Sequence, residues 1–305
     1  MGLRDLIRNI TPNFILNLNR QKKKQARDAK LRAQKEKGEV LTEQILVSQF
    51  QKMGIKKGDC LMVHSAMSKI GYLQDGPKTL VNALLQVIGK EGTLCMPSSP
   101  ISMLQLDYIR QNRVFDVNNT PSAMGAITEY FRTLENVKRS CHPTEPVCAF
   151  GPLADELTGN HFGEPTPYTV NSPWKKLMEA NGKILYIGVT LDNAGTHLHT
   201  LEDAVEFKYP VYFREDFEVE CIMADGEKAV MKTKVHNPEF SKKRKCDELI
   251  PMFEVNEVLM RHKLGETNCL VLDANKMFKT MINQYNLYGI TMYTPKGEKI
   301  AGYDE

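Results

Sequence analysis

The sequence predicts a single α/β domain with a parallel sheet. Residues 60–64 and 92–97 are short apolar runs typical of buried strands, and residues 79–88 between them have helical periodicity. Two strands joined by a helix over so short a stretch form a βαβ unit, in which the strands run parallel. Residues 182–203 add a third buried strand, followed by a polar loop and the start of a helix that Thr196 is expected to cap.

Local signals give the other elements in order. Thr42 is expected to cap a helix that Gly54 ends, and Ser172 to cap one that begins at Pro173. Asp225-Gly226 is a strong hairpin signal. Further expected elements are a polar loop over 98–121, a helix starting at Ser122, a strand at 147–150, a helix at 152–157, the hairpin strands 217–223 and 228–235, helices at 254–262 and 273–285, and a final strand pair at 289–293 and 299–303.

The 305 residues divide by charge into two parts. Residues 1–38 contain eleven Lys or Arg and three acids, a net charge of +8, which leaves −5 for residues 39–305 because the whole chain carries +3. Apolar residues at helical spacing precede the basic run, namely Leu3, Leu6, Ile7 and Ile10. We therefore expect a basic amphipathic arm over 1–38 and one domain over 39–305, without an interior boundary.

The arm resembles an interfacial membrane anchor, because an amphipathic start is followed by residues attracted to anionic lipid. A solvated helix, a disordered tail or a helix docking on a partner subunit in a homo-oligomer are the alternatives. We expect a cytoplasmic protein with peripheral contact at the inner face of the membrane, and expect the domain alone to keep its turnover. Nucleic acid is not an expected partner, since the arm lacks a set of stacking aromatic residues.

The cysteines and the hydropathy argue against a disulfide-bonded, zinc-binding or membrane-spanning protein. The seven cysteines are scattered with no CxxC pair, which favours reduced thiols and gives no zinc spacing, so we expect no metal. No apolar run approaches the ~20 residues of a membrane span. Cys141 is not expected to be a nucleophile, because direct transfer between two bound substrates needs none.

Two positions suggest chemistry. His199 and Glu202 are three residues apart, so on a helix they share a face and can touch. A histidine held by a carboxylate after a buried strand is a minimal general base, although an ordinary polar helix start has the same pattern. Residues 64–71 follow the first strand of the βαβ unit, at the edge where parallel sheets bind ligands. On pattern alone a plain polar loop is equally expected there.

Several segments together resemble the aminoglycoside 3-N-acetyltransferase family of acetyl-CoA-dependent enzymes. The resemblance covers roughly residues 40–210 in the order of the family, and the last third matches only loosely. The segments are VHSAMSKIGYLQDGPKTLVNALLQVIGKEGTLCMP (63–97), FDVNNTPSAMGAITEYFR (115–132), RSCHPTEPVCAFG (139–151), SPWKKL (172–177) and ILYIGVTLDNAGTHLHTLED (184–203).

The resemblance implies a central mixed, partly parallel sheet flanked by helices, and acetyl transfer from acetyl-CoA to a primary amine of an aminoglycoside-like amino sugar. It implies that His199 is the general base, with Glu202 beside it and Asp116 contacting the amine or orienting the base. An imidazole suits the removal of the ammonium proton at neutral pH. The residues implied to hold coenzyme A are His64, Ser65, Ala66, Met67, Ser68, Lys69, Gly71, Ser122, Met124, Arg139 and Ser140.

The chain departs from the family pattern at Ala66, near Glu145 and at Asp75, which puts individual coenzyme contacts in doubt but not the base. Two alternatives remain open. One is N-acetylation of an amino sugar in surface polysaccharide synthesis, and the other is a catalytically silent, membrane-binding member of the family.

Overall fold

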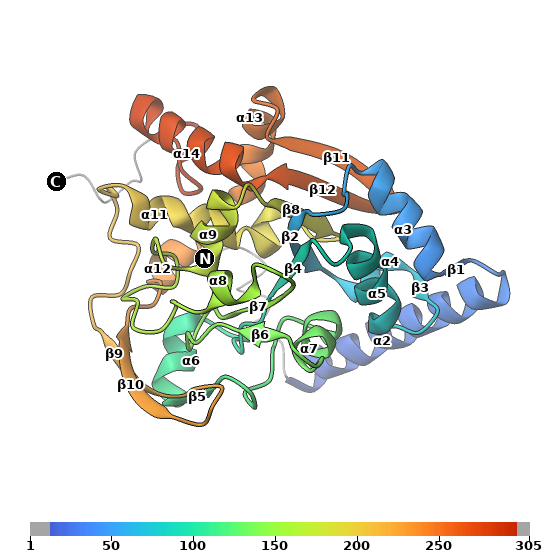
Figure 1. Ribbon diagram of the computed structural model, residues 1–305, viewed down its shortest axis with the longest axis horizontal. Coiled ribbons are helices and arrows are strands. Elements are labelled where there is room, and N and C mark those ends of the chain that lie inside the picture. Colours follow the sequence, from blue (N-terminus) through green and yellow to red (C-terminus); the bar gives the residue numbers. More distant parts are fainter. Residues whose placement is uncertain (1–12, 298–305) are drawn as a thin grey trace.

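In the computed structural model of the protein, which describes residues 13–297, a mixed seven-stranded sheet forms the centre (Figure 1). Its strands are β2 (Cys60–Ser65), β4 (Thr93–Pro97), β6 (Lys138–Arg139), β7 (Val147–Phe150), β8 (Lys183–Ile187), β11 (Leu259–Leu264) and β12 (Thr267–Asp273). They are ordered β11-β12-β8-β2-β4-β7-β6, with β8, β2 and β4 parallel and the outer strands antiparallel. The predicted parallel βαβ unit and the mixed sheet are both confirmed.

The central strands are buried on both faces. Along β2, Cys60 and Met62 point into one apolar cluster, and Leu61 and Val63 into another. The second cluster is covered by α3 (Glu43–Lys52), α5 (Pro77–Ile88) and α7 (Ala126–Arg132); the first is covered by α9 (Pro173–Glu179), α11 (Thr200–Ala204) and α14 (Ala274–Tyr288) (Figure 1). Near-continuous apolar runs are typical of parallel strands that are covered on both faces, so the sequence alone could predict these central strands.

A second sheet lies beside the first and has its own core. It consists of β5 (Val114–Asp116), β9 (Phe217–Ile222) and β10 (Lys228–Thr233), and α6 (Gln105–Gln111) packs on it. The predicted hairpin at Asp225-Gly226 is confirmed as β9–β10. The expected loop over 98–121 is wrong in part, because it contains α6 and β5. Strand β5 forms by pairing with β9, which is far away in sequence and leaves no local signal.

The carboxyl-terminal third departs most from expectation. The helix expected at 254–262 is wrong, since α13 (Ile250–Val255) ends early and β11 begins at Leu259. Strand β11 is an exposed edge strand with charged residues, so it lacks the apolar pattern of a buried strand. Residues 289–293 do not form a strand, and 299–303 lie outside the described residues. The helix expected at 273–285 is confirmed as α14.

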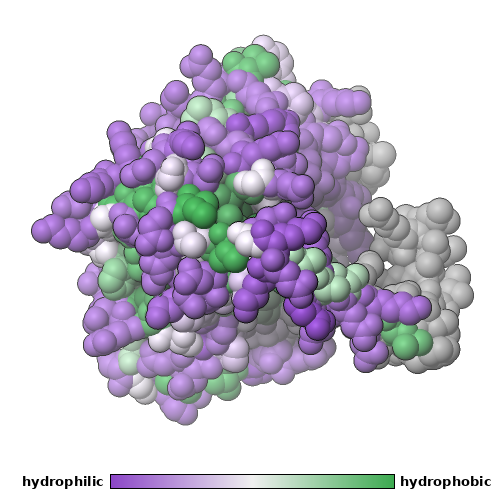
Figure 2. Space-filling view, turned by 90° about the vertical axis from the view of Figure 1, so that its right-hand side faces the viewer, coloured by the Kyte–Doolittle hydropathy of each residue, from purple (hydrophilic) through white to green (hydrophobic). Residues whose placement is uncertain are grey.

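The basic part of the arm forms one continuous helix, α2 (Asn13–Glu36), whereas the four apolar residues near the start of the arm lie outside the described range. Strand β1 (Val40–Leu41) then pairs in parallel with β3 (Tyr72–Leu73) and joins the arm to the domain. Figure 2 shows the side of the molecule where α2, β1 and α3 lie, with hydrophobic residues gathered near its middle and surrounded by hydrophilic ones. Within residues 13–297, no helix is both long and apolar enough to cross a membrane.

The remaining elements are short and connect the larger ones. They are α4 (Met67–Ile70), α8 (Ala154–Thr158), α10 (Leu191–Ala194), the 3₁₀ helix η1 (Thr196–His199), α12 (Pro238–Ser241) and the 3₁₀ helix η2 (Cys246–Leu249).

Candidate active site

The strand–loop–helix segment after β8 positions His199. Strand β8 ends at Ile187, and the chain then forms α10, η1 and α11 in immediate succession. The expectation that Thr196 caps a helix is wrong: Thr196 begins η1 and makes no side-chain cap. His199 is the last residue of η1 and directly precedes α11, and the turn continues without a break. His199 and Glu202 therefore still lie on one face, as their spacing predicts.

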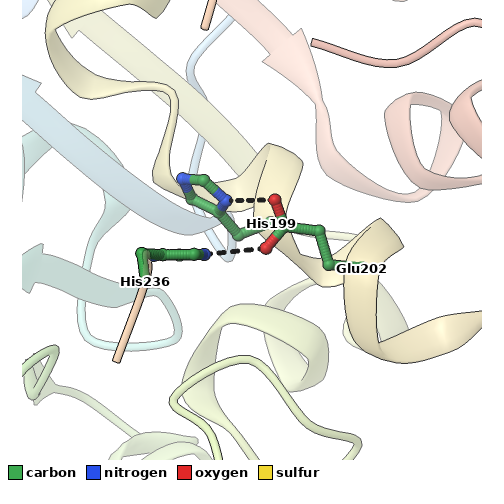
Figure 3. A group of neighbouring side chains, drawn as sticks. All are labelled: His199, Glu202 and His236. Carbon is green, nitrogen blue, oxygen red and sulfur yellow. Dashed lines mark hydrogen bonds and ion pairs between the residues drawn. The ribbon is translucent and has the colours of Figure 1, made fainter. Parts of the chain in front are cut away.

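A buried carboxylate organises the site. The two oxygens of Glu202 lie 2.9 Å from Nδ1 of His199 and 2.8 Å from Nε2 of His236, and both rings point at the carboxylate (Figure 3). The hydroxyl of Tyr293 donates a third hydrogen bond of 2.6 Å to Glu202. The Glu202 side chain is 0% exposed and that of His199 is 7% exposed. Three donors, two of them from distant parts of the chain, thus converge on one buried negative charge.

The hydrogen bonds assign the protons. An ionised carboxylate only accepts, so Nδ1 of His199 and Nε2 of His236 carry the hydrogens that they donate to Glu202. The bond on Nδ1 leaves Nε2 of His199 as the ring nitrogen that can take a proton. A histidine whose tautomer is fixed by a carboxylate is ready to act as a general base.

Burial and charge set the protonation state. Burial lowers the pKa of His199 from 6.5 to about 3, while the negative charge of Glu202 acts in the opposite direction. Burial also lowers the pKa of His236. For Glu202 burial acts to raise the pKa, but charge interactions and hydrogen bonds with the two histidines hold it below its ordinary value. At neutral pH the site is therefore an ionised carboxylate beside two neutral imidazoles.

Aromatic rings hold the imidazoles in place. Tyr168 stacks on both His199 and His236, with ring centroids 4.9 and 5.4 Å apart, and Tyr212 also stacks on His236 at 5.1 Å. The backbone N–H of His236 also donates to the side chain of Gln105 at 3.0 Å. The two rings therefore have little freedom to leave the carboxylate.

Reasoning from the sequence missed His236 and Tyr293. His236 follows the end of β10 and precedes Asn237, which caps α12. A polar residue between a strand end and a helix cap was the only available signal, and it is weak. Tyr293 lies in a loop after α14 and has no local signal, because only the tertiary fold brings it to Glu202.

The donor set His199, Glu202 and His236 is of the kind that holds a divalent metal, and its donor atoms lie within 4.8 Å of one another. However, both imidazoles direct a nitrogen to the carboxylate at hydrogen-bonding distance. A metal would have to displace both bonds. The geometry is that of a hydrogen-bonded triad rather than of an open metal site.

The predicted coenzyme loop lies on a cavity wall. A cavity of about 710 Å³ at the carboxyl end of β2 is also lined by Met124 and the start of α7. The loop residues that line it are Ser65, Ala66, Met67, Ser68 and Gly71. Lys69 lines an adjoining cavity of about 1040 Å³. These volumes suit a small-molecule ligand.

Glycines bring backbone to the wall of the smaller cavity. Gly71, Gly76 and Gly125 all have positive φ, and a Cβ at Gly125 would meet nothing within 4 Å. A bulky ligand can therefore approach the main chain closely there, which fits the group that the resemblance implies.

Other predicted site residues have structural partners. Arg139 donates to the carbonyl oxygens of Ser98, Val117 and Thr120, and Ser140 hydrogen-bonds to His161 at 3.0 Å. The Ser122 hydroxyl accepts from the backbone of Met124. These side chains hold loops together, and a direct contact with coenzyme A stays a prediction.

Asp116 is also engaged locally. Its carboxylate accepts hydrogen bonds of 2.9 to 3.0 Å from Asn118 and Asn119. Burial acts to raise the pKa of Asp116, but these hydrogen bonds and the charge of Arg139 lower it overall. A role in binding an amine remains a prediction.

Four further aromatic side chains pack beside the site. His64 at the end of β2 stacks on Tyr186 at 4.9 Å, and Trp174 meets the edge of His197 at 4.9 Å. Polar atoms of all four are buried and find no hydrogen-bond partner among residues 13–297. Trp174 is fully buried in the core.

Known proteins resemble this chain over most of its domain. The family model for aminoglycoside 3-N-acetyltransferase matches residues 62–286. Aminoglycoside N(3)-acetyltransferase IV of Salmonella is 34% identical over 168 residues, which are 54% of this chain and 60% of that protein. The match thus spans about 60% of the length of this relative.

Two solved structures have the same fold. AAC-IIIb in a binary complex with CoASH superposes with a TM-score of 0.68 at 22% identity, covering 81% of this chain and 97% of that one. AAC-VIa bound to sisomicin superposes with a TM-score of 0.66 at 26% identity, covering 80% and 96%.

Proposed function

Because the chain belongs to the aminoglycoside 3-N-acetyltransferase family, we propose that it transfers an acetyl group from acetyl-CoA to a primary amine of an aminoglycoside-like amino sugar. The observation that carries the proposal is the buried His199–Glu202 pair, held with Nδ1 on the carboxylate and Nε2 left to act as the base. The relatives' names favour an aminoglycoside acceptor over an amino sugar of polysaccharide synthesis.

The reaction needs one proton to move early. An ammonium nitrogen has no lone pair, so Nε2 of His199 takes its proton before or as the nitrogen attacks the thioester carbonyl. The C–N bond forms and the C–S bond breaks. The nitrogen loses a second proton as it becomes an amide, and the departing thiolate takes up a proton to leave as coenzyme A thiol. Glu202 stabilises the imidazolium that forms on His199, and His236 and Tyr293 keep the carboxylate in position.

The cavity beside β2 is the proposed site of acetyl-CoA. Its wall contains hydroxyls, backbone at three glycines and the apolar side chains of Met67 and Met124. A thioester chain with an apolar body and amide groups suits such a lining. The residues with local partners, Asp116, Arg139 and Ser140, would act by fixing the loops around it.

The test is thiol release from acetyl-CoA across a panel of acceptors. Aminoglycosides, simple primary amines and nucleotide-linked amino sugars are supplied to the full-length protein, and each product is identified by mass spectrometry. Release that depends on an aminoglycoside and yields a mono-N-acetyl product supports the proposal. Thiol release only with nucleotide-linked amino sugars would mean that these, and not aminoglycosides, are the acceptors. Binding of acetyl-CoA without thiol release for any acceptor would indicate a catalytically silent family member.

The membrane role of residues 1–38 remains a separate prediction. The basic run forms α2, and part of this helix packs against the domain instead of standing free. Vesicles that contain phosphatidylglycerol test this prediction. If the protein sediments with the vesicles at low salt but not at high salt, it binds the membrane surface through charge.

A further inference from the structure

Helix α2 forms one wall of the two cavities beside the β2 loop. Arg27 and Leu31 of α2 line both, together with Ser68, Gly71 and Tyr72 of the domain. Because the cavities share these residues, they are neighbours along one groove. The family match begins at residue 62, so α2 adds a wall from outside the matched region.

Several contacts fix this part of α2 on the domain. Lys35 lies over the ring of Tyr72 at 5.5 Å, and Lys30 pairs with Glu266 at 3.8 Å. The chain continues into β1, which pairs with β3, the strand that follows the coenzyme loop. The groove is therefore built jointly by α2 and by residues 65–73.

The groove is positively charged although the domain is acidic. Four cations line the two cavities (Arg27, Lys30, Lys37 and Lys69) against two carboxylates (Glu39 and Glu266). Arg27 also pairs with Asp28 at 2.9 Å, but both are exposed, and a guanidinium keeps further donors for a second anion. Three of the four cations, Arg27, Lys30 and Lys37, come from the basic arm, whereas residues 39–305 as a whole carry −5.

We propose that the cationic side of α2, with Arg27 at its centre, binds the phosphate groups of the nucleotide end of acetyl-CoA. This inference rests on the proposed function. Coenzyme A has a short apolar thioester arm and a nucleotide with several phosphates, and the groove has a matching division: a small cavity with one cation, and an adjoining larger one with the full set. Arginine binds phosphate through two parallel hydrogen bonds.

The inference reverses one expectation from the sequence. There the arm was predicted to be dispensable for turnover, because the base and the coenzyme loop lie in residues 39–305. With α2 on the groove, the basic run takes part in binding the cosubstrate. A membrane surface would compete for the same cations, so the two roles are separable by experiment.

The test compares two charge reversals on the full-length protein. Arg27→Glu changes a groove residue, and Arg32→Glu changes an exposed arginine of the same helix that lines neither cavity. Calorimetry with coenzyme A and with adenosine 3′,5′-diphosphate measures binding without turnover. We expect Arg27→Glu to weaken both by about tenfold or more, since one charge-assisted contact is lost and a repulsion is added. Arg32→Glu should change them less than twofold.

The donor provides a second readout. S-acetylpantetheine lacks the nucleotide and its phosphates, so Arg27→Glu should raise KM for acetyl-CoA and leave KM for S-acetylpantetheine unchanged. Arg27→Lys keeps the charge and should restore most of the affinity. A selective loss with the nucleotide-bearing ligands supports the inference.

Three outcomes overturn it. If Arg27→Glu and Arg32→Glu weaken coenzyme A binding equally, the effect comes from overall charge and not from the groove. Unchanged affinity in a folded Arg27→Glu protein removes α2 from the site. If Arg27→Glu loses binding to vesicles of phosphatidylcholine with phosphatidylglycerol but keeps its affinity for coenzyme A, the helix is assigned to a membrane surface.

The proposed function can fail separately. If the wild-type protein binds coenzyme A but acetylates no amine in the panel, the proposed function fails while the groove assignment stands.

Discussion

Two groups of buried aromatic and histidine side chains lie close together and differ in how their polar atoms are satisfied. In the first, His199, His236 and Tyr293 all donate to the carboxylate of Glu202. In the second, polar atoms of His64, His197, Trp174 and Tyr186 find no partner within the described residues. Rings surround both groups, but only the first contains a charge.

The difference shows what organises a buried polar site. A carboxylate that accepts three hydrogen bonds stays ionised in the interior and orients each donor. Buried polar atoms without partners cost about 1–3 kcal/mol each unless water or a ligand satisfies them. We therefore expect the first group to tolerate substitution poorly and the second to tolerate apolar replacement.

The largest effect should come from removing His199, the proposed base. His199→Ala is expected to lower kcat by ~10²–10⁴, because Nε2 no longer takes the proton of the amine. Affinity for coenzyme A, measured by calorimetry, should be nearly unchanged, since the cavity lining is intact. His262→Ala, on the edge strand β11, is the control and should keep full turnover. A His199→Ala protein with more than about a third of wild-type turnover contradicts the assignment.

Glu202→Gln tests the charge at the centre of the first group. An amide presents one oxygen and one NH₂, so at least one of the three donors loses its acceptor. We expect turnover to fall by ~10–10² and the free energy of unfolding in urea to fall by about 1–3 kcal/mol. Glu206→Gln, an exposed change of the same kind in the following segment, should affect neither. Equal stability of the two variants would show that the charge does not organise the site.

The pH profile tests the protonation state. Burial lowers the pKa of His199, so the imidazole stays neutral, with Nε2 free to accept a proton, to well below pH 6.5. As pH falls, kcat/KM should stay level through pH 6.5 and decline only at more acidic pH. Glu202 raises this pKa, so Glu202→Gln should move the decline to still lower pH. A decline centred at pH 7 or above, in protein that circular dichroism shows to be folded, contradicts this.

The smallest effect should be in the second group. His197→Phe removes two ring nitrogens that have no partner in the described structure, so the free energy of unfolding should change by less than about 1 kcal/mol. The matched change His236→Phe removes a hydrogen bond to a buried carboxylate and should cost about 1.5–3 kcal/mol. Urea unfolding of both variants measures the contrast. A larger cost for His197→Phe would mean that an ordered water or ligand binds the second group.

Local sequence determined much of the frame. The parallel unit β2–α5–β4 is visible as apolar runs around a helical period, because strands covered on both faces must be apolar throughout. Ser172 caps α9 and accepts from Lys175, and Asp225-Gly226 turns the hairpin β9–β10, since both depend on neighbouring residues alone. The contact of His199 with Glu202 was also predictable, because three residues along any helical turn lie on one face.

Tertiary structure decided the rest. Strand β5 exists because β9 pairs with it, and β11 is an edge strand whose charged residues hide it from pattern reasoning. His236 and Tyr293 reach Glu202 from separate loops. Helix α2 lies along the proposed coenzyme groove, where it contacts Tyr72 and Glu266. Spacing along a chain fixes only neighbours within a turn or two. His236 and Tyr293 complete the three-donor centre at Glu202 through packing, and no periodicity in the sequence encodes their approach.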